Sequence, residues 1–571
     1  MAQELTDAGL DVIALERGAW RNTGTDFPPN QMQDELRYRV RHDLFLKPAQ
    51  TTFTFRNKMN QQALPIRTWG AFMPPNGVGG GGVHWNAETW RFLPSDFLLR
   101  THLTQRYGKH FLPADMTIQD WGVTYEELEP HYDRFEYLCG TCGTAGNLNG
   151  QIQEGGNPFE GPRSRPYPNP AQLQPYSHTL FAQAARELGY KPFPQPSGNL
   201  SQAYTNPLGV RLGPCTYCGF CEWFGCGNYS KASPQTTILP ALIRQPNFTL
   251  RDQSEVTRIN TDASGKRATG VTFVDASGEE WEQPAQLVIL SAYTVFNVQL
   301  LLLSKIGRPY DPIANSGVIG RNFTHQTISD VVSFFDKSKY IFNPFIASGS
   351  IGMCIDEFNG DNFDHGPHGF VGGGYMGQVQ TNGRPIETTP VPPGTPRWGA
   401  QWKQAVRDNY LSAIKPGTGV HGSMYSYRDV YLDLDPTYRD RFDRPLMRIT
   451  IDFHDNEIKQ NKFLTDKFAE IFRAMGATQM SKEYRKAPYD ITDYQTTHLC
   501  GGAVMGTSSA TSALNRYLQS WDVPNLFVMG ASAFPQNAGY NPTGTLAALA
   551  YWSAKAIREQ YLKNPGPLVQ T

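Results

Sequence analysis

Apolar and polar residues alternate along this chain in a pattern that predicts a mixture of strands and helices. Residues 1–10 have the spacing of the last turns of an amphipathic helix, and 11–18 (DVIALERG) form a short apolar run, typical of a buried strand, that ends in an acid and a glycine. The most apolar stretch, 287–303, is interrupted by Ser291, Asn297 and Gln299. It therefore predicts a buried strand that leads into a buried helix, and not a membrane span.

The C-terminal half continues this alternation. Residues 446–452 predict a strand, and an amphipathic helix follows it with an apolar side made of Phe463, Phe468, Ile471 and Phe472. Residues 525–532 (NLFVMGAS) predict a last strand and a glycine turn. A helix should then open at Pro542, which suits a first helical position, with Asn541 before it as a natural cap.

Length and charge limit the class of protein. At 571 residues the chain is too long for one compact core, so we expect two closely packed domains. Its 51 Lys and Arg residues against 52 Asp and Glu leave no charge excess for nucleic acid or an anionic membrane surface. The first residues (MAQELTDAGLDV) are polar and acidic, so we expect neither a signal peptide nor a transmembrane helix in this chain.

Four of the eight cysteines lie close together, at Cys215, Cys218, Cys221 and Cys226. The spacing C-x2-C-x2-C-x4-C brings soft thiolates to one point and favours an iron–sulfur cluster. Zinc, which prefers two C-x2-C pairs set farther apart, and disulfides in an oxidising compartment are the alternatives. The remaining cysteines are expected to be structural, as a disulfide or thiols in the pair CGTC and as buried small residues elsewhere: Cys139, Cys142, Cys354 and Cys500.

The acid that ends the first predicted strand, Glu16, has the position of a ribose-binding group. In a dinucleotide-binding βαβ unit, an Asp or Glu at this point takes the ribose hydroxyls, and a G-x-G-x-x-G loop lies roughly 20 residues earlier. We therefore expect that loop to fall before Met1. The alternative is an ordinary buried strand with a solvated Glu16.

Two further segments contain candidate chemistry. The glycine-rich loop 77–87 (GVGGGGVHWNA) permits close approach of backbone to a flat ligand, and its apolar residues argue against the alternative of a flexible hairpin. The segment THLCGGAVMG contains His498. Taken singly, His498 and Asn541 are more simply explained as a core histidine and a helix cap.

Together these segments resemble a known family. The strings VIALERG, GVGGGGVHWN, HLCGGAVMG and NLFVMGAS…NPTGTLAALA occur here in the order found in the glucose–methanol–choline (GMC) flavoprotein oxidoreductases. The likeness spans most of the chain. It is greatest to the large flavoprotein subunits of membrane-associated bacterial dehydrogenases that act on gluconate, 2-ketogluconate, fructose, sorbitol or glucose.

The resemblance implies a mixed α/β fold: a Rossmann-like FAD-binding domain with an antiparallel-sheet substrate cap, here without its first strand and glycine loop. We expect the FAD-binding domain at 1–100, at 201–325 with the cysteine-rich insertion, and at 481–571 with the catalytic pair. Residues 101–200 are expected to form cap and linker elements, and 326–480 the cap itself.

The resemblance also implies roles for residues. His498 is the expected base and Asn541 its catalytic partner. FAD contacts are expected at Glu16, Arg17, Gly79, Gly80, His84, Asn86, Ala87, Val256, Gly530, Ala531, Asn541 and Thr543. A [3Fe-4S] cluster would be held by Cys218, Cys221 and Cys226, with Cys215 as a spare or fourth ligand.

The expected activity is that of an FAD-dependent dehydrogenase that oxidises D-gluconate to 2-dehydro-D-gluconate. Its electrons would pass to a cytochrome c subunit, in a complex with a small chaperone-like subunit. The partner subunits would hold the complex at the periplasmic face of the bacterial inner membrane. The alternatives are a polyol, ketose or aldose dehydrogenase subunit and a degenerate, non-catalytic flavoprotein subunit.

Overall fold

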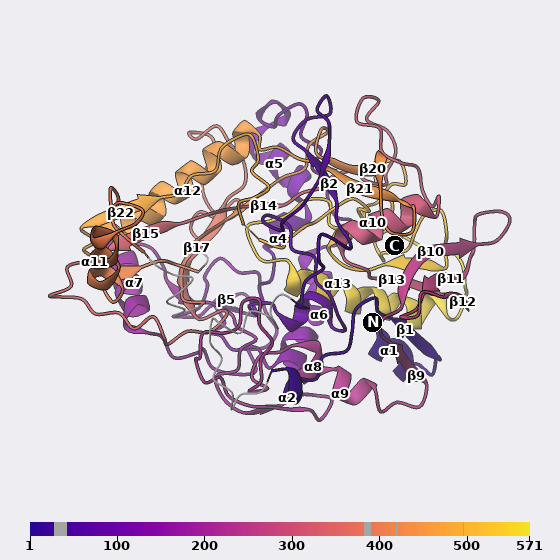
Figure 1. Ribbon diagram of the computed structural model, residues 1–571, viewed down its shortest axis with the longest axis horizontal. Helices are drawn as coiled ribbons and strands as arrows, with labels where there is room; N and C mark the ends of the chain where they lie inside the picture. The colour runs from indigo at the N-terminus through magenta and orange to yellow at the C-terminus, as the bar shows by residue number, and fades with distance from the viewer. Residues whose placement is uncertain (28–42, 382–389, 418, 495, 571) are drawn as a thin grey trace.

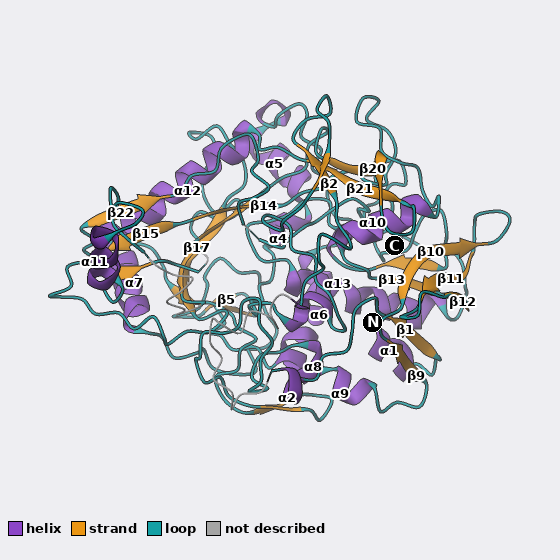
Figure 2. Ribbon diagram, viewed as in Figure 1, coloured by secondary structure: helices purple, strands orange, loops and turns teal. Residues whose placement is uncertain are grey.

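The computed structural model describes residues 1–27, 43–381, 390–417, 419–494 and 496–570. Figure 1 shows an elongated molecule: both termini and the parallel strands lie toward one end, and the long helix α12 (Asp455–Ala474) lies toward the other. Strands gather near these two ends, and long loops fill much of the space between them (Figure 2).

Two pairs of parallel strands lie at the end of the molecule that holds both termini. Strand β1 (Val12–Leu15) pairs with β9 (Phe248–Arg251), and β13 (Val288–Leu290) pairs with β23 (Leu526–Val528). Each pair joins segments that lie more than two hundred residues apart in the chain, so this unit is discontinuous, as parallel connections require. The predicted strand and helix of the stretch 287–303 are confirmed as β13 and α10.

Helices and a small sheet surround these strands. Helix α1 precedes β1, α10 follows β13, and α13 follows β23 and packs on α6. Helix α6 begins at a capping box of Thr124 and Glu127 and ends at Gly140, which adopts a left-handed conformation (φ 68°) that favours glycine. The bounds are α1 (Ala2–Asp7), α6 (Tyr125–Cys139), α10 (Thr294–Leu303), α13 (Thr543–Ala556), and the antiparallel strands β10 (Glu255–Thr261), β11 (Ala268–Val274) and β12 (Glu280–Pro284).

The second unit confirms the expected antiparallel sheet. Its five strands run in the order β14-β19-β17-β16-β6, and every neighbouring pair is antiparallel. Helix α12 packs on this sheet with Phe468, Ile471 and Phe472 fully buried, as the amphipathic pattern predicts. The bounds are β6 (Phe193–Pro194), β14 (Gln326–Ser329), β16 (Gly352–Ile355), β17 (Gly374–Val379) and β19 (Val420–Ser423), with β15 (Val331–Phe334), β18 (Ala413–Ile414) and β22 (Gln479–Lys482) in a neighbouring sheet.

A four-stranded sheet connects the two units. Strand β2 (Thr54–Arg56) pairs in parallel with β21 (Pro445–Thr450), and β20 (Tyr431–Arg439) and β3 (Leu64–Pro65) complete the sheet. Residues 431–450 are therefore hydrogen-bonded to the N-terminal part of the chain. The predicted strand at 446–452 is confirmed as β21.

The remaining elements are short. They are α2 (Thr23–Asp26), α4 (Pro94–Phe97), α5 (Leu99–Tyr107), α7 (Tyr176–Glu187), α8 (Pro234–Thr237), α9 (Leu239–Leu242), α11 (Ala400–Asn409), β4 (Asn147–Leu148), β5 (Gln151–Ile152), β7 (Tyr204–Thr205) and β8 (Arg211–Leu212). Among the described residues no helix is both long and apolar enough to cross a lipid bilayer.

Candidate active site

The structure brings His498 and Asn541 together. Asn541 Nδ2 lies 3.4 Å from His498 Nε2, and Asn541 is buried. The expected capping role of Asn541 is wrong, because α13 begins at Thr543 with Pro542 as its N-cap residue. The Asn541 side chain instead points back toward the histidine.

Gln326 on β14 determines which ring nitrogen of His498 carries the proton. The Gln326 Nε2 group donates to the carbonyl oxygens of Ala538 (2.9 Å) and Tyr540 (2.8 Å), which fixes the orientation of the amide. Its Oε1 therefore faces His498 Nδ1 at 2.6 Å and must accept a hydrogen bond from the N–H group there. His498 Nε2 is left with the lone pair and faces Asn541.

Burial keeps His498 neutral. The pKa of His498 lies well below its usual value, first because burial disfavours the charged ring and then because His421 and His325 are close. The rings of His498 and His421 lie 6.0 Å apart. A neutral imidazole with an available lone pair is ready to accept a proton from a bound hydroxyl group.

A cavity of about 550 Å³ lies between the two pairs of parallel strands and the glycine-rich loop. Five of the expected cofactor residues line it: Glu16, Arg17, Gly79, Gly80 and Val256. Sequence reasoning missed several others that line it, among them Tyr293, Phe296, Arg441 and Arg444.

Charged groups face one end of this cavity. Arg17 is 3.3 Å from Glu255, and Arg441 and Arg444 lie 2.6 Å and 3.2 Å from the same carboxylate. Three guanidinium groups thus share one glutamate. Burial raises the pKa of Glu16, whose carboxylate accepts a hydrogen bond from the Gly18 amide at 2.8 Å. A ligand with hydroxyl groups and an anionic group fits this polar lining.

The glycine loop supplies an open backbone surface to the same cavity. Gly79 has a φ of 92°, and a Cβ atom there would lie 2.8 Å from the amide of Gln235. A Cβ on Gly80 would meet nothing within 4 Å, so this side of the loop is open. A Cβ on Gly18 would lie only 2.2 Å from the Gly77 nitrogen, because the end of β1 touches the loop. These contacts suit a flat ring held against backbone.

The other expected cofactor residues do not line this cavity. His84 is buried, and burial together with Lys231 lowers its pKa to about 3. Ala531 accepts a hydrogen bond from Gly501 (2.9 Å), which joins the turn after β23 to the His498 segment. The role of the rest in cofactor binding stays a prediction: Asn86 and Ala87 after the glycine loop, Gly530 beside Ala531, and Thr543 at the start of α13.

The cysteine loop (residues 215–226) packs against the glycine loop. The Trp223 amide donates to the His84 carbonyl at 2.9 Å. None of the eight cysteines is in a disulfide, so neither a Cys139–Cys142 bridge nor bridges within the loop are found. Burial raises the pKa of Cys215 to about 12, and also raises the pKa values of Cys218 and Cys221.

The four sulfurs of the loop are not gathered around one point. No three of these described thiols lie within 4.8 Å of one another. A tetrahedral zinc ion would hold its sulfurs about 4 Å apart, so the geometry argues against a preformed zinc site. A multi-iron cluster separates its ligands farther, because each sulfur binds a different iron.

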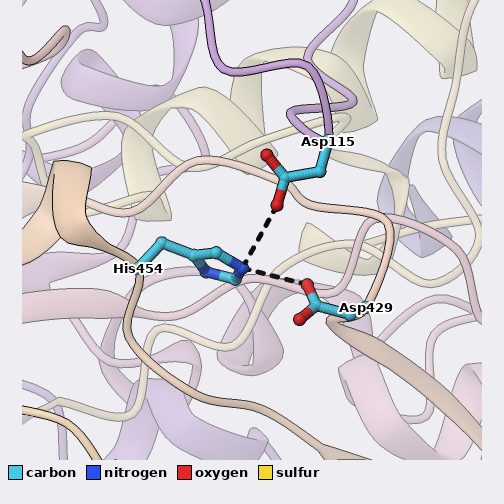
Figure 3. A group of neighbouring side chains, drawn as sticks. All are labelled: Asp115, Asp429 and His454. Atoms are coloured by element: carbon cyan, nitrogen blue, oxygen red, sulfur yellow. Dashed lines mark hydrogen bonds and ion pairs between the residues drawn. The ribbon is translucent and has the colours of Figure 1, made fainter.

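One group of His and Asp side chains has a spacing that could suit a metal ion. His454 Nε2 lies 3.0 Å from Asp429 and 3.7 Å from Asp115, as Figure 3 shows. The ring stacks on Tyr427 with centroids 3.7 Å apart. Burial alone would lower the pKa of His454, but the hydrogen bond and charge of Asp429 outweigh it and raise that pKa. A protonated histidine between two carboxylates accounts for this group.

The sequence and the fold also match known proteins. Two family models, both described as GMC oxidoreductase, match residues 168–328 and 427–550. The gluconate 2-dehydrogenase flavoprotein of Pantoea cypripedii is 52% identical over 576 residues, which cover 100% of this chain and 93% of that protein. The 2-methyl-1,2-propanediol dehydrogenase of Mycolicibacterium austroafricanum is 26% identical, with 98% and 92% covered.

A solved structure shares the fold at low sequence identity. A mutant form of the formate oxidase of Aspergillus oryzae superposes with a TM-score of 0.57 at 14% identity, covering 98% of this chain and 96% of that one. The expected mixed α/β architecture is therefore confirmed, and by full-length similarity and two matching family models the chain belongs to the GMC oxidoreductase family.

Proposed function

We propose that this chain is the flavoprotein subunit of a dehydrogenase that oxidises a sugar acid, with D-gluconate and its C2 hydroxyl as the preferred substrate. One observation carries the proposal above all: 52% identity over the whole chain to a gluconate 2-dehydrogenase flavoprotein. The closeness of His498 and Asn541 supports their proposed role as the catalytic pair of such an oxidation.

The residues around the cavity fit FAD. The glycine loop leaves an open backbone surface, Glu16 offers a carboxylate to ribose hydroxyls, and three guanidinium groups lie at one end. Bound FAD would supply the acceptor for the hydride that leaves the carbinol carbon. The protein's own side chains would accept the hydroxyl proton and orient the substrate.

His498 and Asn541 divide the remaining work. His498 Nε2 holds a lone pair, and the low pKa of the ring keeps it neutral at working pH, so it accepts the proton of the substrate hydroxyl. The Asn541 amide nitrogen lies next to Nε2 and donates to the same oxygen. Two groups that converge on one oxygen orient the hydrogen of the carbinol carbon.

The cysteine loop is the proposed exit for electrons. It lies against the glycine loop, and none of its cysteines is in a disulfide. The buried ammonium of Lys231 donates to the carbonyls of Cys221 (3.0 Å) and Phe224 (2.7 Å). A buried cation here offsets the negative charge of a thiolate-ligated [3Fe-4S] cluster held by Cys218, Cys221 and Cys226.

We also propose which partner accepts the electrons and where the complex lies. A cytochrome c subunit would receive the electrons, a small chaperone-like subunit would accompany the flavoprotein, and the complex would lie at the periplasmic face of the inner membrane. A flavoprotein that delivers single electrons needs such a partner, since the hydride brings two electrons at once.

The test is anaerobic reduction of the FAD-loaded protein by separate substrates. Gluconate should bleach the flavin bands faster than sorbitol, fructose, glucose or 2-ketogluconate. Faster bleaching by one of those four would move the assignment to a polyol, ketose or aldose dehydrogenase. An FAD-loaded protein that no substrate bleaches would refute an enzymatic role.

A further inference from the structure

A chain of buried side chains runs from the catalytic pair into the protein interior. The Tyr375 hydroxyl on β17 lies 3.1 Å from Asn541 Oδ1 and 3.0 Å from Glu88 Oε2. Tyr375 is fully buried, Glu88 nearly so, and the Tyr375 ring stacks on His421 with centroids 4.9 Å apart. Neither Glu88 nor Tyr375 was expected in the site from the sequence.

We propose that Glu88, as a neutral carboxylic acid, and Tyr375 are positioning residues that fix the orientation of the Asn541 amide. The inference rests on the proposed roles of His498 and Asn541. Glu88 and Tyr375 need not touch the substrate, because they act through Asn541.

The direction of each hydrogen bond follows from counting protons. His498 Nε2 carries a lone pair, since the ring proton is on Nδ1, which donates a hydrogen bond to Gln326. The Asn541 group beside it at 3.4 Å is the NH₂ group, so Oδ1 faces Tyr375. An amide oxygen only accepts, so Tyr375 donates its single proton there.

Glu88 must then be the donor at the far end. The Tyr375 hydroxyl uses its single O–H in the hydrogen bond to Asn541. Its oxygen can therefore only accept a hydrogen bond from Glu88 Oε2. Glu88 can donate only when it is protonated. The chain therefore runs from the Glu88 carboxyl through Tyr375 to Asn541, and it leaves the Asn541 NH₂ group directed at His498 and the substrate oxygen.

The surroundings of Glu88 favour the neutral form. Burial is the largest effect, and Glu222 of the cysteine loop adds a negative charge, whereas the nearby polar groups of Tyr375, Trp90 and Asn541 would stabilise the carboxylate and so oppose them in part. Together they raise the pKa of Glu88 to about 8. The other ionisable groups that sense its charge are Cys354 on β16 and Tyr494, which are neutral at this pH, and His421 over Tyr375 is uncharged because burial lowers its pKa to about 3.

Deprotonation of Glu88 should reverse the direction of the hydrogen bond between Glu88 and Tyr375. A Glu88 carboxylate would accept the hydrogen bond of the Tyr375 hydroxyl, and Asn541 Oδ1 would lose its donor. The amide would no longer be held with its NH₂ group toward the substrate. Because the group is neutral below its pKa and charged above it, the rate of flavin reduction should fall as the pH rises through about 8.

Three variants test this with the FAD-loaded full chain and single-turnover flavin reduction by gluconate. Glu88→Gln keeps a donor that does not titrate, so the alkaline decline should disappear. Glu88→Leu removes the donor, and its rate at pH 7 should be about tenfold below that of Glu88→Gln. Tyr375→Phe cuts the chain, so kcat should fall about tenfold with little change in KM, and the remaining rate should no longer respond to pH near 8.

The matched control is Tyr427→Phe. Tyr427 is also buried, and its hydroxyl lies 3.2 Å from a buried glutamate, Glu457, but that pair lies outside the site. Its pH profile should follow that of the unmodified protein. An alkaline decline that persists in both Glu88→Gln and Tyr375→Phe would overturn the inference, whereas a His498→Ala variant that still reduces flavin normally would overturn the proposed function instead.

Discussion

Replacement of Gln326 by leucine removes the acceptor that holds the proton on His498 Nδ1. The same side chain donates to the carbonyls of Ala538 and Tyr540, so the variant also leaves two buried carbonyl groups without this donor. We expect a loss of unfolding free energy of about 1–3 kcal/mol for each carbonyl. The structure should survive this loss, because leucine has nearly the volume of glutamine.

The catalytic effect is separate from the loss of stability. Without Gln326 Oε1, the tautomer with its proton on Nε2 becomes accessible, and that tautomer offers no lone pair to the substrate. A hydrogen bond of this kind is worth about 1 kcal/mol, so we expect flavin reduction by gluconate to slow by up to roughly tenfold, with KM nearly unchanged. Single-turnover absorbance measures the rate, and thermal unfolding measures the stability.

Gln519 provides the matched control for this experiment. It is equally buried and donates to the carbonyls of Pro524 (2.6 Å) and Gly566 (2.8 Å), outside the site. Gln519→Leu should lose a similar amount of stability and keep its rate of flavin reduction. The tautomer argument fails if the folded Gln326→Leu variant reduces flavin as fast as the Gln519→Leu variant.

Three further predictions concern the cavity, the cysteine loop and His454. Arg17→Gln should weaken FAD binding by about tenfold, measured by flavin fluorescence, whereas Arg258→Gln on the outer face of β10 should not; equal affinities would remove Arg17 from the cofactor site. Cys218→Ser should lower the iron content after cluster reconstitution and abolish any paramagnetic resonance signal of a three-iron cluster, and Cys139→Ser should change neither. For His454, the raised pKa means that its stabilising contribution is fully present below about pH 6 and is lost as the pH rises through the folded value. His454→Gln should therefore lower stability by under about 1 kcal/mol at pH 5.5 and by less at pH 9, as measured by urea unfolding; a larger loss at pH 9 would contradict the ion pair.

Local patterns predicted most of the regular structure. The apolar stretch 287–303 became β13 and α10, because a run of apolar residues this long can only be buried. On α12, Phe468, Ile471 and Phe472 are buried on one side of the helix, as a period of 3.6 residues predicts, whereas the predicted member Phe463 lies on another side and is only partly buried. The family motifs also placed Glu16, Arg17, Gly79 and Gly80 at the cavity.

The site residues that the sequence did not reveal contact partners that lie far away in the sequence. Gln326 lies 172 positions from His498, and Tyr375 lies 166 positions from Asn541. Each occupies an ordinary position on a strand of the cap sheet, where nothing nearby in the sequence marks it. Asn541 was expected to cap α13 because local rules favour that role, but Pro542 is the N-cap residue and the tertiary contacts take the Asn541 side chain elsewhere.

The central claim is that His498 accepts the proton of the substrate hydroxyl in a gluconate-oxidising flavoprotein. The most direct measurement is the single-turnover rate of flavin reduction by gluconate in His498→Ala and in the unmodified chain, both with FAD bound. We expect the variant to be slower by roughly 100-fold or more at pH 7, with its FAD content unchanged. A variant that binds FAD and is reduced at the rate of the unmodified protein would contradict the account.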